Sequence, residues 1–265
     1  MPPKTIKVLS MVVGSALAAF LIGLPQILQA APQQQTATQA ANAQNSDLAA
    51  RLNKKQFKDV KATIDNGIAT LTGTVDLYQW KADAERRVHR AKGVVAVRNL
   101  IEVTGAAVDD KTLQAKLAEK LSYDRVFYGN AFNAIGVNVE NGQVTLSGHA
   151  RTPVDKESAL ALVATTSGVK DLVDEIEVDP ASSWDDETRI RVAHAIYDYP
   201  SLSRYGSDPA KPIRISVQNG HVELYGMVDT QADKDTAYLR AMGVSNVFSV
   251  KNYLAVAGQT TETKK

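Results

Sequence analysis

Hydrophobic and polar residues alternate in three short stretches of the chain, at residues 60–64, 135–139 and 213–217. Alternation with a period of two is the pattern of a β-strand with one buried face. Each stretch is followed by Asn-Gly and by a second alternating stretch, which ends at a glycine six residues after the first one. Asn-Gly supplies the two positive-φ residues that a type I′ turn requires. The pattern therefore predicts three β-hairpins.

The three hairpins belong to one repeated unit, because their motifs lie 75 and 78 residues apart. Twenty residues after the second glycine of each motif, a turn residue precedes a third alternating stretch. In the third copy this turn residue is asparagine, which after glycine best tolerates the left-handed conformation. The residues predicted to share these turn roles are Asn66, Gly67, Gly73 and Gly93, then Asn141, Gly142, Gly148 and Gly168, then Asn219, Gly220, Gly226 and Asn246.

Helical periodicity fills the gap between the second and third strand of each unit. Apolar or small residues recur there with i, i+4, i+7 spacing, which marks one buried helix face: Ala84, Val88 and Ala91; Ala159, Val163 and Thr166; Ala237, Ala241 and Val244. A further helix precedes each hairpin. The fold class is therefore α+β, with three tandem αββαβ modules, each a small three-stranded sheet with two helices on one face. The pattern leaves open which strand is central.

The repeat divides the chain into module 1 (residues 46–104), module 2 (109–179) and module 3 (184–256). Residues 1–30 have a basic start, an apolar run and a small residue at position 30, so they are expected to form a signal peptide. Residues 31–45 are expected to be a flexible linker, and residues 257–265 a disordered tail. Export without any cysteine favours a bacterial periplasm. The alternative is an inner-membrane anchor over residues 8–28.

Taken together, the motif N-G-x-V-x-L-x-G and the sequence G-V-x-x-V-x-[ND]-x-[IL]-x-V that follows after twenty residues resemble the BON domain of OsmY-type bacterial periplasmic proteins. Module 2 carries the fullest form, whereas module 1 departs from it at Ala69 and module 3 lacks a glycine at position 246. The resemblance implies a non-enzymatic envelope protein, linked to stress, whose domain is proposed to bind phospholipid surfaces. The lipoprotein branch of the family is excluded, because the chain has no cysteine to carry a lipid.

Residues for catalysis do not form a recognisable set. The four histidines lack metal-ligand spacing, and His149 and His221 are expected to be exposed because each follows a motif glycine. The acidic pairs at 109–110 and 185–186 precede predicted helices and are interpreted as N-terminal caps. We therefore expect no enzyme activity, no catalytic residue, no metal and no cofactor.

A basic helix with aromatic residues at its start is the main candidate binding surface. Such a helix suits an anionic lipid interface, although an ordinary solvated face with Trp80 packed on a neighbouring module is the competing interpretation. A second candidate lies on the first helix of module 3, where Trp184 could instead be a hydrophobic staple. The predicted lipid-binding residues are Trp80, Lys81, Arg86, Arg87, Arg90 and Lys92, together with Trp184, Arg189 and Arg191.

The charge balance limits the choice of partner. Without residues 1–30 the chain has 28 basic and 29 acidic residues, so it lacks the basic excess that nucleic-acid binding requires. Expected partners are anionic phospholipid or other envelope components, with periplasmic proteins as the alternative in a scaffold or chaperone-like role. Tyrosine-rich loops, with Tyr123 in module 2 and Tyr197 and Tyr205 in module 3, line a ligand groove or cover a sheet edge.

Overall fold

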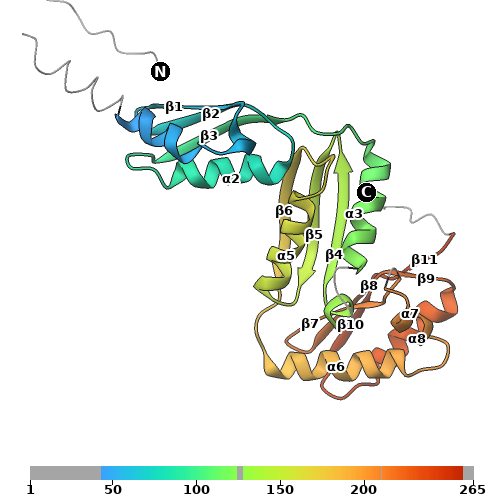
Figure 1. Ribbon diagram of the computed structural model, residues 1–265. Helices are drawn as coiled ribbons and strands as arrows, with labels where there is room; N and C mark the ends of the chain where they lie inside the picture. The colour runs from blue at the N-terminus through green and yellow to red at the C-terminus, as the bar shows by residue number, and fades with distance from the viewer. Residues whose placement is uncertain (1–42, 124–127, 210, 259–265) are drawn as a thin grey trace, which may run out of the picture. The chain divides into compact units, whose positions relative to one another are not determined.

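A computed structural model describes residues 43–123, 128–209 and 211–258, which form three modules of like topology (Figure 1). The predicted signal peptide, the possible anchor over 8–28 and most of the predicted linker lie outside the described residues. Residues 43–45, predicted as the end of the linker, are already part of a helix over 43–51. Within the described ranges, no helix is both long enough and apolar enough to cross a membrane.

Each module follows the predicted order of helix, two strands, helix and strand. Module 1 contains the helix over 43–51, η1 (Lys55–Phe57), β1 (Val60–Asp65), β2 (Ile68–Val75), α2 (Tyr78–His89) and β3 (Ala96–Val103). Module 2 contains α3 (Asp110–Tyr123), α4 (Tyr128–Ala131), β4 (Ala134–Glu140), β5 (Gln143–Ala150), α5 (Pro153–Ala164) and β6 (Asp171–Val178). Module 3 contains α6 (Ser183–Tyr197), α7 (Arg204–Ser207), β7 (Arg214–Gln218), β8 (His221–Tyr225), β9 (Met227–Val228), α8 (Gln231–Met242), β10 (Ser249–Asn252) and β11 (Ala255–Val256).

The second strand of each hairpin is the central strand of its sheet. The strand orders are β1-β2-β3, β4-β5-β6 and β7-β8-β10. The hairpin strands pair antiparallel, and the third strand adds in parallel after the crossover helix. In module 3 the central strand is divided into β8 and β9 at Gly226, and β11 pairs separately with β9. This order settles the point that the sequence pattern left open.

The predicted turn residues occupy equivalent positions in all three modules. Asn66, Asn141 and Asn219 have φ values of 48°, 54° and 51°, each followed by a positive-φ glycine. Asn246 has φ 74°, in the same region as its counterparts Gly93 and Gly168. The structure therefore confirms that asparagine replaces glycine at this turn in module 3.

The second glycine of the motif is required by a close backbone contact. A Cβ on Gly73 would lie 1.9 Å from the carbonyl oxygen of Asp59, and one on Gly148 would lie 2.1 Å from that of Ala134. Real Cβ atoms do not approach backbone this closely, and both glycines also have φ near or above 100°. Glycine at this position therefore allows the backbone that leads into the neighbouring hairpin strand to approach closely.

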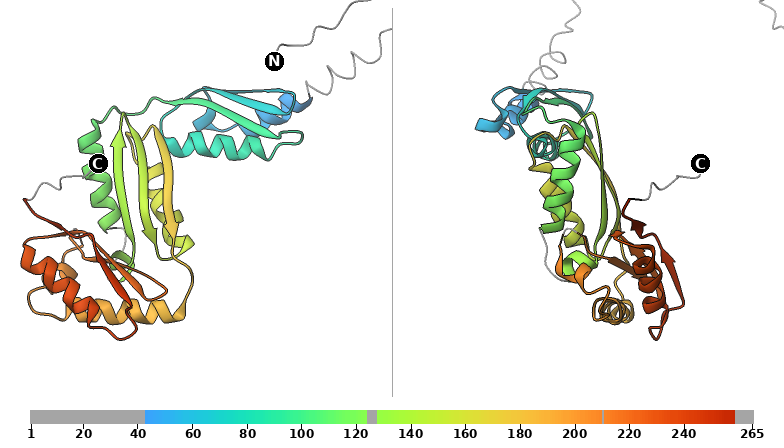
Figure 2. Two further views of the ribbon diagram at one scale, coloured as in Figure 1. Left: turned by 180° about the vertical axis from the view of Figure 1, so that it is seen from behind. Right: turned by 90° about the vertical axis from the view of Figure 1, so that its right-hand side faces the viewer.

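Both helices of a module cover one face of its sheet, as predicted (Figure 2, right, for module 2). The helical stripes form the core together with inward-facing strand residues; Ala84, Val88, Ala159, Val163, Ala237 and Ala241 are all 0% exposed. Neighbouring modules also share apolar packing. Phe132 of module 2 is buried in the module 3 core, and Tyr78 of module 1 packs against the module 2 core. These contacts extend each small core, which would be marginal alone.

Candidate functional site

The inward part of the basic helix α2 is committed to protein contacts. Trp80 is half-buried against the core of its own module. The Lys81 side chain is 19% exposed, and its Nζ lies 3.7 Å from Asp171 Oδ1 of module 2. The Arg87 guanidinium lies 5.7 Å from the centre of the Phe57 ring and donates to an acidic residue one turn earlier. The competing interpretation placed Trp80 against a neighbouring module. Trp80 instead packs on module 1, so that part of the interpretation is wrong.

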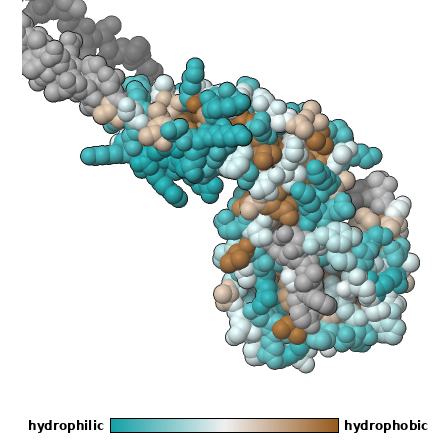
Figure 3. All heavy atoms as spheres, in the orientation of Figure 1, coloured by the Kyte–Doolittle hydropathy of each residue, from teal (hydrophilic) through white to brown (hydrophobic). Residues whose placement is uncertain are grey.

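The outward part of α2 and the turn after it form what we call the cationic face, consisting of Arg86, Arg90 and Lys92. The Arg86 side chain is 68% exposed, and Arg90 and Lys92 are exposed. A shallow groove of about 380 Å³, bounded in part by Tyr78, Arg86 and Arg90, runs along the helix beside these residues. Hydrophilic side chains project along this side of module 1 (Figure 3). Of the six residues predicted here, these three are exposed enough to meet a partner surface, and Arg86 also lies 3.7 Å from Asp83 Oδ1 on the same helix.

Net charge differs between the modules. Module 1 has eleven basic and seven acidic residues, module 2 has seven basic and twelve acidic, and module 3 has eight basic and nine acidic. The near-neutral total therefore conceals a basic module beside an acidic one. A per-module count of the sequence contains this signal, but the whole-chain balance does not.

Trp184 lies inside helix α6 and is not a staple before it. The helix is capped by Ser182, whose side chain accepts a hydrogen bond from the amide of Asp185. A staple residue would precede this cap, whereas Trp184 is the second residue of the helix and is 54% exposed. The staple interpretation is therefore wrong, and Trp184 remains available at the surface.

Arg189 is not a surface residue, so its prediction as a lipid contact is wrong. Its side chain is 2% exposed, with Nη2 2.8 Å from Asp179 Oδ2 and 2.7 Å from the carbonyl oxygen of Val217. These acceptors replace water at Nη2, and Asp186 accepts from Nη1, whereas Nε is buried without a hydrogen-bond partner. Arg191, two residues on, is partly exposed and pairs with Glu187 on the same helix.

Arg189 belongs to a polar group at the boundary of modules 2 and 3, here called the junction cluster: His149, Asp179, Arg189, Ser216 and Gln218. Asp179 is the centre, with a side chain that is 1% exposed. Its amide donates to the carbonyl of Ala150 in module 2. Its carboxylate accepts hydrogen bonds from Arg189, Gln218 (2.9 Å) and Ser216 (3.2 Å) of module 3. One residue thus joins the backbone of module 2 to three side chains of module 3.

The charges around the junction cluster alter its titration. Burial alone raises the pKa of Asp179, but hydrogen bonds from His149 and Gln218 and the charge of Arg189 outweigh it and hold this pKa below its usual value. The hydrogen bond to Asp179 raises the pKa of His149; desolvation opposes this, and the charges of Asp179, Glu223 and Glu177 add to it. The imidazolium and the carboxylate therefore stabilise each other.

His149 was expected at the surface, and this prediction is wrong. Its side chain is 18% exposed because module 3 packs over the end of β5, whereas His221 is exposed as predicted. The two histidines border a polar groove of about 370 Å³, which Glu223 and Lys251 also line. In the described ranges, no group of three or more His, Cys, Asp or Glu side chains is placed so that it could hold a metal ion.

The acidic residues before the hairpins do more than cap helices. Asp109 does act as a cap, accepting from the amide of Thr112 at 3.0 Å. Asp110, however, accepts from the amides of Asn141 and Gly142 at 2.6 and 2.8 Å. Asp185 makes the same pair of bonds to Asn219 and Gly220, both at 2.9 Å. The carboxylates of Asp110 and Asp185 therefore hold the first helix of modules 2 and 3 against the hairpin turn.

The polar residue in the third strand fastens the crossover helix. Asn99 Nδ2 donates to the carbonyl of Lys81, and Asn252 Nδ2 donates to that of Lys234. Asp174 has no amide to donate, and in module 2 the ammonium of Lys156 instead lies 2.8 Å from it. Lys156 therefore makes this contact through its ammonium group, whereas Lys81 and Lys234 contribute their backbone carbonyls.

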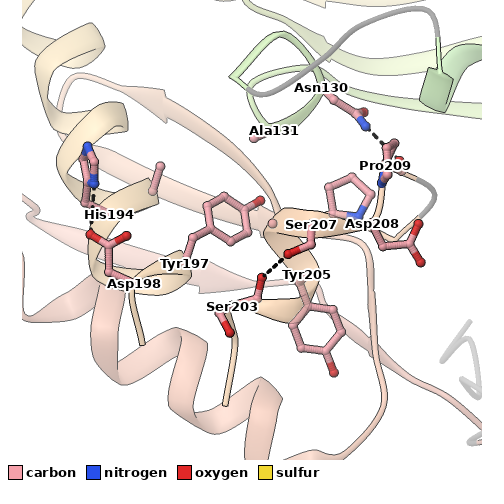
Figure 4. Close-up of a pocket in the computed structure, with 13 residues that line it drawn as sticks. Asn130, Ala131, His194, Tyr197, Asp198, Ser203, Tyr205, Ser207, Asp208 and Pro209 are labelled. Carbon is pink, nitrogen blue, oxygen red and sulfur yellow. Dashed lines mark hydrogen bonds and ion pairs between the residues drawn. The ribbon is translucent and has the colours of Figure 1, made fainter. Parts of the chain in front are cut away.

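Two tyrosines of module 3, Tyr197 of α6 and Tyr205 of α7, form hydrogen bonds to the backbone and border a cavity (Figure 4). Tyr197 donates to the carbonyl of Ile213, and Tyr205, 2% exposed, accepts from the amide of Asp229. A cavity of about 780 Å³ lies beside them and is also lined by Asn130 of module 2, whose amide donates to the carbonyl of Pro209. Both tyrosines therefore hold the chain in place and border this cavity.

Comparison with known proteins places this geometry in a family. The family model described as "BON domain" matches residues 40–105, 109–180 and 201–258. The 21 kDa hemolysin of Actinobacillus pleuropneumoniae is 31% identical over 160 residues, which is 57% of this chain and 77% of the relative. Osmotically-inducible protein Y of Escherichia coli K12 is 27% identical over 158 residues, 57% of this chain and 74% of the relative.

The chain belongs to the BON-domain family and carries three BON domains in tandem. The third match begins at residue 201, so it omits α6, which the structure shows to be the first helix of module 3. A solved structure of CdsD, a structural protein of the type III secretion system of Chlamydia trachomatis, aligns over 80% of this chain and 90% of its own, at 17% identity and a TM-score of 0.24. A TM-score this low carries no structural argument.

Proposed function

We propose that this protein is a non-enzymatic, exported binding protein that contacts anionic phospholipid surfaces of the cell envelope through the cationic face of module 1. Residues 1–30 direct it to the periplasm in this proposal, or residues 8–28 hold it at the inner membrane. The relative from E. coli is named for osmotic induction. This supports a role in protecting the envelope under osmotic stress.

The observation that carries the proposal is the exposure of Arg86, Arg90 and Lys92 on the one module with an excess of basic residues. Each lysine or arginine near an anionic membrane surface adds about 1 kcal/mol of attraction, so three together raise affinity by roughly two orders of magnitude. The attraction falls off within a Debye length, so binding of this kind weakens as salt increases.

Co-sedimentation with vesicles tests the proposal. The chain is expected to bind vesicles containing anionic phospholipid at low salt, to release at high salt, and to ignore neutral vesicles. The variant Arg86→Glu, Arg90→Glu, Lys92→Glu is expected to lose binding. Its control is Lys111→Glu, Lys116→Glu, Lys170→Glu, which makes the same charge change at exposed sites of module 2 and is expected to bind normally. Equal loss in both variants, or no binding at any salt, contradicts the proposal.

A protein-contact role is the alternative, and a stripe on α8 favours it. Tyr238, Leu239 and Met242 are 37%, 66% and 39% exposed. They occupy the positions that Glu85, Arg86 and His89 occupy on α2. An exposed apolar stripe on one helix is suited to docking against another protein. Capture of a periplasmic protein partner that survives the triple charge reversal in module 1, but not Leu239→Glu, would support this role.

A further inference from the structure

We propose that His149 is a pH-dependent latch between modules 2 and 3, closed when its ring is protonated and loosened when the ring is neutral. The ring belongs to β5 of module 2, and it faces side chains from β7 and β8 of module 3. The latch is separate from the proposed lipid-binding face, which lies on module 1.

The position of the imidazole between two carboxylates supports the closed state. His149 Nδ1 lies 3.4 Å from Asp179 Oδ1, and Nε2 lies 4.0 Å from Glu223 Oε2. In the imidazolium both ring nitrogens are donors. A protonated His149 thus faces one carboxylate at each nitrogen and draws β8 of module 3 toward the end of module 2.

A third neighbour gives the neutral ring a different partner. Gln218 Nε2, a donor, lies 3.3 Å from His149 Nδ1 and also 2.9 Å from Asp179 Oδ1. A neutral ring with its proton on Nε2 accepts a hydrogen bond at Nδ1. Deprotonation therefore removes the charge that attracts Glu223 of module 3, and the contact between the modules that remains at the ring is a neutral hydrogen bond from the Gln218 amide, which is weaker than a charged one.

The remaining charges around the ring leave a negative surplus. Glu177 of β6 lies directly opposite His149 in the strand register. The centre of the Tyr225 ring lies 6.2 Å from that of the imidazole, and the Tyr253 ring stacks on Tyr225. Arg189 of α6 neutralises Asp179, and Lys251 of β10 neutralises Glu223 at 2.8 Å. Glu177 remains near the ring in addition to these two pairs, so the site favours a cation.

The direction of the pH effect follows from this environment. The folded protein holds the pKa of His149 above its unfolded value. The protonated contact is therefore fully present below the unfolded pKa, and it is lost as pH rises through the folded pKa. The junction is expected to tighten in mild acid and to loosen on the alkaline side of neutral.

Spin-label distance measurements on the full chain test the latch. The chain has no cysteine, so one label at Glu175→Cys and one at Ser245→Cys report the spacing of modules 2 and 3 without interference. Between about pH 6 and pH 8.5 the open population of the parent protein is expected to rise roughly two- to fivefold, the range expected for one half-buried ion pair.

Variants that fix the charge separate a latch from a passive contact. His149→Gln, neutral at every pH, is expected to stay at the alkaline distribution, and His149→Arg, cationic at every pH, at the acidic one. The control His221→Gln removes the exposed histidine of the same groove and is expected to respond like the parent. A pH response that persists in His149→Gln, disappears in His221→Gln or is absent from the parent overturns the proposal.

Discussion

Arg189 and Asp179 form a buried ion pair across the boundary between two BON domains, with Nη2 and Oδ2 2.8 Å apart and side chains 2% and 1% exposed. The arginine comes from the first helix of module 3, and the aspartate follows the last strand of module 2. The pair therefore links the two domains through a buried, charged contact.

Removal of one partner from this pair should be costly. Arg189→Met leaves Asp179 buried without its main counter-charge, which typically costs about 3–5 kcal/mol. Urea unfolding of the full chain should therefore show a large loss for Arg189→Met. Arg191→Met, on the same helix and partly exposed, should change stability by no more than about 0.5 kcal/mol. Similar losses in both variants would contradict a buried structural role for Arg189.

Acid should weaken the same interface. The pKa of Asp179 is lower in the folded protein than in the unfolded chain. Its contribution is therefore present above the unfolded pKa and lost as pH falls through the folded pKa. Asp179→Asn should be less stable than the parent at pH 7, and its stability should fall less between about pH 5 and pH 2. Parallel pH profiles for the two proteins would exclude this linkage.

The helix carboxylates that hold the hairpin turns should be sensitive to loss of charge. Asp185→Asn keeps the size of the side chain but replaces one acceptor with a donor facing an amide. We expect a loss of about 1–3 kcal/mol in unfolding free energy. Glu187→Gln, two residues on and exposed, is the control and should be near neutral.

Two glycines of one hairpin, the motif glycine Gly148 and Gly136 on the adjacent strand, should respond differently to replacement by alanine. Gly148→Ala places a Cβ 2.1 Å from the carbonyl oxygen of Ala134 at φ +99°, so it should destabilise module 2 by about 3 kcal/mol or more. In Gly136→Ala, on the adjacent strand, the nearest atom lies at an ordinary 3.6 Å. That substitution should be tolerated or slightly stabilising. Thermal unfolding compares the two variants directly.

Local features could be predicted from the sequence because they depend on neighbouring residues. The Asn-Gly turns, the helical stripes and the left-handed Asn246 follow from spacing and backbone preference, and the structure confirms them. The contacts of His149 and Arg189 could not be predicted in this way, because they depend on how module 3 packs against module 2. One signal was present: Arg189 lies beside Thr188 and one turn before Val192, on the apolar face of its helix.

Hydrogen–deuterium exchange of the full chain, with and without vesicles containing anionic phospholipid, tests the binding surface most directly. Residues 78–98 of module 1 correspond through the repeat to residues 153–173 and 231–251, so the other two modules are internal controls. The account predicts slower exchange on vesicles over residues 78–98 and little change in the other two segments. Protection confined to module 3, or equal in all three segments, would contradict it.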